Sequence, residues 1–129
     1  MKKAYKITLI VTAAVLVGCL GCLYFTGHSG FTRYSEPKEE QVRIACVGDS
    51  ITYGFGIGNW PKNNYPTVLS ELLGEAYHVQ NFGVSGCVVQ KDSDAPYIES
   101  NRYVRSLAYT PDVLVFMMGT NDSKPENWK

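Results

Sequence analysis

The chain has 129 residues, enough for one domain at most. Its 12 basic and 12 acidic residues cancel to a net charge of zero, so it lacks the basic surface that nucleic-acid binding requires. Hydrophobic residues make up 45% of the sequence, which is typical of a globular protein.

The first 25 residues form a basic and then an apolar segment. Three lysines lie within the first six residues, and residues 7–25 then carry no charge. As a helix this run would be about 28 Å long, close to the ~30 Å hydrocarbon thickness of a bilayer. We therefore predict a signal anchor in residues 1–25 that crosses the cell membrane once and leaves the folded part outside the cytoplasm.

Two other interpretations of this segment stay open. It can be a cleaved secretory signal, because the apolar core of such a signal needs only about 7–15 residues. It also contains a Leu-Val-Gly-Cys run ending at Cys19, which is similar to a bacterial lipoprotein cleavage site. The protein would then be secreted or lipid-anchored through Cys19.

Residues 26–41 are polar, with glycines, a proline and a charged run, and predict a linker. The folded part is then residues 42–129.

Cys46 and Cys87 lie in this folded part, and the sequence is compatible with a disulfide between them or with two free thiols.

The folded part alternates strands and helices. We predict strands over residues 42–47, 77–82 and 113–118, and helices over residues 66–74 and 98–108. This order is typical of right-handed βαβ units and a parallel sheet. The third strand is a continuous apolar run, which suits a strand buried in a parallel sheet.

Each predicted helix carries an apolar stripe, which we expect to pack on the sheet. In the first helix the stripe consists of Tyr65, Val68, Leu69, Leu72, Leu73 and Ala76. In the second helix it consists of Val104, Leu107 and Ala108.

Candidate catalytic groups follow the end of each predicted strand. Ser50 follows the first strand, Gly83 the second and Asn121 the third. The carboxyl ends of parallel strands meet at one edge of the sheet, where open α/β folds place their sites. Ser50 can supply a nucleophile and its own N–H, Gly83 a second N–H, and Asn121 an amide for an oxyanion. Taken singly, each residue is better explained by a turn or a helix cap than by a catalytic role.

Together these residues make the chain resemble the SGNH hydrolases, a superfamily of GDSL-like esterases and lipases. The resemblance lies in three blocks: Gly48-Asp49-Ser50-Ile51-Thr52, Asn81-Phe82-Gly83-Val84-Ser85-Gly86 and Gly119-Thr120-Asn121-Asp122. It implies a flavodoxin-like three-layer α/β/α sandwich whose parallel sheet has the strand order two-one-three.

The resemblance also implies the roles of the site residues. Ser50 would be the nucleophile, and the Ser50 N–H, the Gly83 N–H and the Asn121 side chain would form the oxyanion hole. Asp49 and Asp122 would orient the surrounding loops. No metal or cofactor is expected. The substrate would be an acyl ester, with short-chain or O-acetyl esters on carbohydrates favoured over lysophospholipids and thioesters.

The sequence departs from the family pattern in its catalytic base. The family places this base in a later Asp-x-x-His block, and the histidines here are His28, in the predicted linker, and His78. His78 precedes Gly83 by five residues, about 17 Å along a strand. We therefore expect the N-terminal part of a longer enzyme, inactive and poorly folded alone, with the third strand as an exposed apolar edge.

A non-catalytic protein is the alternative. It would bind a saccharide or a partner through the same edge of the sheet. Tyr53, Trp60 and Tyr65 are the candidates for stacking on a sugar.

Overall fold

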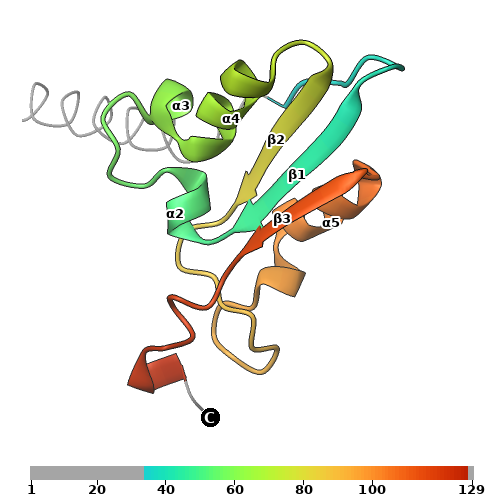
Figure 1. The fold of residues 1–129 in the computed structure, drawn as a ribbon. Helices are drawn as coiled ribbons and strands as arrows, with labels where there is room; N and C mark the ends of the chain where they lie inside the picture. The colour runs from blue at the N-terminus through green and yellow to red at the C-terminus, as the bar shows by residue number, and fades with distance from the viewer. Residues whose placement is uncertain (1–33, 128–129) are drawn as a thin grey trace, which may run out of the picture. The chain divides into compact units, whose positions relative to one another are not determined.

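The computed structural model describes residues 34–127, and the predicted signal anchor lies outside them. Figure 1 shows the arrangement of the elements. They are, in chain order, β1 (Val42–Gly48), α2 (Ser50–Tyr53), α3 (Trp60–Asn63), α4 (Tyr65–Leu73), β2 (Tyr77–Gly83), a 3₁₀ helix (Tyr97–Glu99), α5 (Asn101–Ala108), β3 (Val113–Met117) and a second 3₁₀ helix (Pro125–Asn127). Within the described residues, no helix is both long and apolar enough to span a bilayer.

The three strands form one parallel sheet in the order β2-β1-β3. Both the parallel pairing and this order confirm the prediction. Gly48, the last residue of β1, is the register partner of Gly83 in β2 and of Met117 in β3. All three strands therefore end at the same edge of the sheet.

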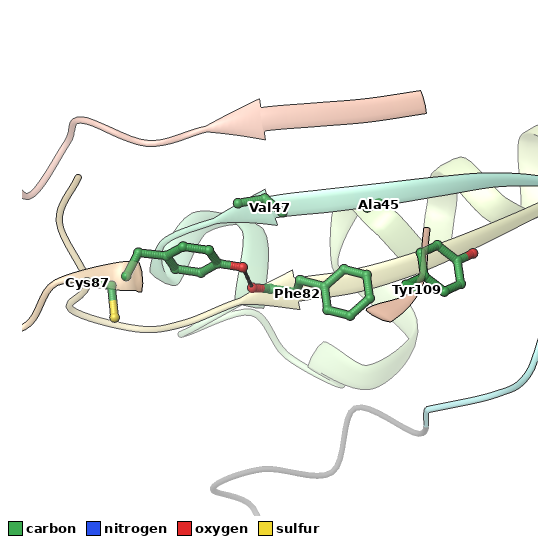
Figure 2. Close-up of a cluster of buried hydrophobic side chains, with 6 residues drawn as sticks. Ala45, Val47, Phe82, Cys87 and Tyr109 are labelled. Carbon is green, nitrogen blue, oxygen red and sulfur yellow. Dashed lines mark hydrogen bonds between the residues drawn. The ribbon is translucent and has the colours of Figure 1, made fainter. Parts of the chain in front are cut away.

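Helices cover both faces of this sheet, with α2 and α4 on one face and α5 on the other (Figure 1). On the α5 face lies the buried cluster of Figure 2, which consists of Ala45, Val47, Phe82, Cys87, Tyr97 and Tyr109. On the other face, the buried Cys46 lies beside the Tyr65 hydroxyl of α4. The alternation of side chains along β1 therefore serves both layers of an α/β sandwich, as predicted for this part of the domain.

The predicted core-facing stripe of α4 is wrong for most of its residues, although Tyr65 and Leu69 are half-buried. Val68, Leu72 and Leu73 are exposed, Leu72 to 79%, and Pro66 is the buried residue of this helix. No described element packs over the outer side of α4. Its apolar residues instead line a groove of about 480 Å³, formed by Ile51, Ile57, Asn63, Tyr65, Val68, Leu69 and Leu72.

The predicted face of α5 is also wrong. Val104 and Leu107 are exposed, whereas Tyr103 packs against the buried cluster and Ser106 is buried. The helix begins at Asn101 rather than residue 98, because the Ser100 side chain accepts a hydrogen bond from the Tyr103 N–H and caps it. Aromatic packing on the sheet, rather than the aliphatic stripe, sets the rotation of this helix.

The linker predicted over residues 26–41 does not run free of the domain from residue 34 onward. The Tyr34 ring packs edge-on against Phe82 and Tyr109, with centroids 6.1 Å and 6.5 Å away. The Gln41 side chain donates to the Glu75 carbonyl at 2.8 Å.

Cys46 and Cys87 are both buried free thiols, so the first of the two open alternatives, a disulfide between them, is not formed.

The third strand is an exposed apolar edge, as the sequence predicts for this stretch of chain. Val113, Leu114, Phe116 and Met117 are exposed, with Leu114 and Phe116 each at 57%. A long apolar edge strand is a template for intermolecular pairing. The apolar run of this strand alone had suggested a buried strand, and that expectation is wrong for the described residues, because no described element packs beyond β3.

We expect residues 42–129 expressed alone to self-associate through β3. Replacing Leu114 and Phe116 by lysine should raise the monomeric fraction, because charge on an edge strand opposes pairing. The control is Val104→Lys on α5, which adds a charge at a site that is 62% exposed and away from the edge. Sedimentation velocity measures the result. A monodisperse monomer of the unmodified segment would refute the expectation.

Candidate active site

Ser50 is the first residue of α2 and is half-buried. Asp49, which is 1% exposed, forms the N-cap: its Oδ1 accepts from the Ile51 N–H at 2.9 Å. A carboxylate in this position satisfies a free N–H and stabilises the start of a helix. Asp49 therefore fixes the turn that presents Ser50.

Two glycines let α2 pack directly on the strand ends. A Cβ added at Gly48 would lie 1.9 Å from Thr52 Oγ1, and one added at Gly83 would lie 2.3 Å from the Tyr53 nitrogen. Both positions therefore exclude any side chain. Gly83 is explained by this close packing before any catalytic role is considered.

The Gly83 N–H already has an acceptor in this structure. It donates to Asn81 Oδ1 at 2.8 Å, and a backbone nitrogen carries a single hydrogen. Its predicted role in an oxyanion hole thus requires that the Asn81 bond opens.

Gly86, in the loop that follows β2, is a second candidate donor. It is exposed, has a positive φ of 83°, and would find no atom within 4 Å of an added Cβ. No described residue accepts a hydrogen bond from its N–H. Gly86 belongs to the second block, although no role was predicted for it; the signal in the sequence is a glycine that follows shortly after the end of a strand.

Asn121 and Asp122 fasten the segment after β3 to the loop after β2. Asn121, which is 6% exposed, donates through Nδ2 to the Cys87 carbonyl at 3.0 Å. Asp122 Oδ1 accepts from the N–H groups of Val89 and Gln90 at 2.8 Å and 3.1 Å. An amide nitrogen carries two hydrogens, so the bond to the Cys87 carbonyl uses one of the two donors of Asn121.

His78 lies near the start of β2, at the end opposite to the site. Its Nδ1 contacts the Tyr109 hydroxyl at 2.5 Å and its Nε2 contacts Ser35 Oγ at 2.9 Å. Burial lowers the pKa of this imidazole. His78 therefore acts in the packing of residues 34–36 and does not serve Ser50; His28 lies outside the described residues.

Two of the three aromatic residues proposed for sugar stacking lie together. The Tyr53 and Trp60 rings stack with centroids 4.7 Å apart and planes 23° apart. Tyr53 is three residues after Ser50 on α2, hence on a neighbouring part of the helix surface. Tyr65 points elsewhere: its hydroxyl contacts Thr52 Oγ1 at 3.3 Å, and burial raises its pKa to about 12.

Within residues 34–127, no group of three or more His, Cys, Asp or Glu side chains is placed to hold a metal ion. What this edge of the sheet does offer is a serine at the start of α2, the Asn121 amide and the Gly86 N–H, which has no acceptor among the described residues. Such groups can carry acyl transfer, in which a nucleophile attacks a carbonyl and donors stabilise the resulting oxyanion.

Comparisons with known proteins place these residues in a family. Residues 46–129 match the GDSL-like Lipase/Acylhydrolase family. Over 93 residues the chain is 50% identical to an acetylxylan esterase of Xylanibacter ruminicola, a match that covers 72% of this chain and 19% of that protein. No solved structure gave a significant match. The family match covers well over half of the sequence and agrees with the parallel sheet and with Ser50 at its edge; the chain belongs to the GDSL-like lipase/acylhydrolase family of SGNH hydrolases.

Proposed function

We propose that the complete protein is a serine esterase that removes short acyl groups, above all O-acetyl groups, from a carbohydrate. The observation that carries the proposal is Ser50, held by the Asp49 cap at the edge where all three strands end. The acetylxylan esterase relative supports the substrate class. The stacked Tyr53 and Trp60 support a saccharide next to the acyl group, because aromatic rings offer an apolar surface to a ligand.

In this proposal the Ser50 hydroxyl loses its proton to a base as its oxygen attacks the acyl carbonyl, the ester C–O bond breaks, and the departing sugar oxygen takes up that proton to leave an acyl-enzyme. Water then attacks the acyl-enzyme, which releases acetate and restores the Ser50 hydroxyl. The oxyanion accepts hydrogen bonds from the Ser50 N–H, from Asn121 Nδ2 and from a glycine N–H of the second block, either Gly83 after its bond to Asn81 opens or Gly86. Asp122 keeps Asn121 in place through the loop contacts described above. A histidine base, which activates the hydroxyl, would come from a part of the protein outside residues 34–127.

The discriminating experiment compares three substrates with the complete protein. We expect acetate release from acetylated xylan to exceed fatty-acid release from a lysophospholipid and hydrolysis of a long-chain acyl thioester. Each rate is measured with wild-type protein and with Ser50→Ala. Ser50-dependent hydrolysis of a long-chain substrate alone would overturn the acetyl-ester proposal.

One observation favours a long-chain acyl substrate as the second candidate. The apolar groove over α4 begins at Ile51, the residue after Ser50, and continues along Val68 and Leu72. Exposed apolar surface near a site is typical of ligand or partner binding. If Ile51→Ser lowers hydrolysis of octanoyl esters but leaves acetyl esters unaffected, the groove holds an acyl chain.

We also propose that residues 7–25 anchor the protein in the cell membrane with the domain outside the cytoplasm. The length and charge pattern of the segment support this. Carbonate-washed membranes should retain the protein, and Cys19→Ser should leave this retention unchanged. Recovery of the full-length chain in the soluble fraction would refute anchoring, whereas release by Cys19→Ser would show lipidation instead.

A further inference from the structure

A buried amide at the end of β2 joins three parts of the candidate site. Asn81 is 6% exposed, and its Nδ2 donates to the Thr52 carbonyl at 2.7 Å and to Asn64 Oδ1 at 3.3 Å. Its Oδ1 accepts from the Gly83 N–H at 2.8 Å. Its backbone carbonyl accepts from Arg102 of α5 at 3.1 Å. Asn81 thus connects β2 with α2, with the start of α4 and with α5.

The bond to Thr52 matters because α2 has only four residues. A helix this short gains little from its own hydrogen bonds and depends on external contacts. Asp49 holds its first turn through the Ile51 N–H, and Asn81 holds the Thr52 carbonyl near its other end. Ser50 lies between these two attachments.

Asn64, which accepts the second hydrogen bond of the Asn81 amide, is itself held in place by other bonds. It is 2% exposed, and its Oδ1 accepts from the Thr67 N–H at 3.1 Å as the N-cap of α4. Its Nδ2 donates to the Trp60 carbonyl at 2.5 Å. The orientation of the Asn64 amide is therefore fixed by α3 and α4, which in turn fixes the oxygen that receives the second hydrogen of Asn81.

We propose that Asn81 is a positioning residue for the nucleophile: its amide fixes the Ser50-bearing helix α2 against the end of β2. This inference rests on the proposed esterase function. It assigns Asn81 no contact with substrate. The Asn81 side chain instead determines where Ser50 Oγ lies relative to the acyl carbonyl and the oxyanion donors.

The expected consequence is a loss in turnover rather than in substrate binding. A displacement of about 1 Å at a reacting group can lower the rate by about 10²-fold. The acyl ester is bound by other surfaces, so KM should change much less than kcat.

The experiment uses the complete protein with Asn81→Ala and Asn81→Asp. The second variant keeps the side-chain size and an acceptor for Gly83, but it loses both N–H donors. We expect kcat for p-nitrophenyl acetate to fall about 10²-fold in both, with KM within about threefold of wild type. The rate of covalent labelling by a fluorophosphonate should fall in parallel.

Tyr97→Phe is the matched control. It removes another buried hydrogen bond to β2, from the Tyr97 hydroxyl to the Phe82 carbonyl at 2.8 Å, without a contact to α2. We expect its kcat to stay within about threefold of wild type at a similar loss in thermal midpoint.

Three outcomes would overturn the inference: wild-type turnover in Asn81→Asp, an equal loss of kcat in Tyr97→Phe, or loss of the folded state in both Asn81 variants by circular dichroism. A wild-type protein that neither hydrolyses esters nor is labelled at Ser50 would instead remove the proposed function, on which the inference rests.

Discussion

Ser50→Ala should abolish ester hydrolysis by the complete protein, with kcat falling by about 10⁴-fold or more, the usual cost of removing a nucleophile. The loss should not come from unfolding. Ser50 is half-buried at the start of α2, and the cap that holds this turn comes from the Asp49 side chain and the Ile51 N–H, which the substitution leaves intact. Steady-state kinetics with p-nitrophenyl acetate and thermal melts measure the two quantities separately.

Ser85→Ala is the control for this experiment. Ser85 is an exposed serine in the loop after β2, at the same edge of the sheet, and the substitution removes the same hydroxyl. It should leave kcat within about threefold of wild type. Hydrolysis that survives Ser50→Ala and disappears with Ser85→Ala would move the nucleophile from the first block to the second.

Asn121→Ala should lower kcat by about 10²–10³-fold, the usual cost of one oxyanion donor, while KM changes little. The oxyanion forms only as the carbonyl is attacked, so a donor aimed at it stabilises the transition state more than the bound substrate. Covalent labelling of Ser50 should remain detectable, because the nucleophile is still present.

Asn121 also has a structural bond, which the control has to separate from its proposed catalytic role. Its Nδ2 donates to the Cys87 carbonyl, and its own carbonyl accepts from Asn127 Nδ2 at 2.6 Å. Asn127→Ala removes a bond to this same residue without removing the amide that would serve the oxyanion. A loss of kcat as large in Asn127→Ala as in Asn121→Ala would assign the effect to loop position.

The parallel pairing of the strands and the edge that carries the site follow from local features of the sequence, whereas the strand order β2-β1-β3 was implied by the resemblance to the SGNH hydrolases. Continuous apolar runs separated by helical segments specify parallel strands, and parallel strands bring their carboxyl ends together. Residues that follow β1, β2 and β3 are therefore neighbours in space, and Ser50 could be recognised from its place just beyond Gly48.

The helix faces could not be predicted in the same way. An apolar stripe shows which residues favour burial but not which neighbouring element is available to cover them. Leu72 and Val104 satisfy the pattern yet remain exposed, because no described element packs over them. On α5, Tyr103 takes the position toward the buried cluster instead, and its ring centroid lies 6.2 Å from that of Tyr97 in the preceding 3₁₀ helix.

The hydrogen bonds that hold α2 at the end of β2 could not be predicted from the sequence either. Asn81 belongs to the second block, but its bond to the Thr52 carbonyl joins residues 29 positions apart, through one side chain and one backbone atom. No spacing rule predicts such a contact. The same bond network occupies the Gly83 N–H, so the role of Gly83 depends on tertiary structure rather than on its place after a strand.

The identity of the nucleophile is tested most directly by mapping a covalent adduct. The complete protein is treated with a fluorophosphonate, digested, and analysed by tandem mass spectrometry. We predict one adduct per chain, on Ser50, with formation blocked by prior acylation of the enzyme with a slowly hydrolysed ester. An adduct on another residue, or undiminished ester hydrolysis by a protein whose Ser50 is fully modified, would contradict the assignment of Ser50 as the nucleophile.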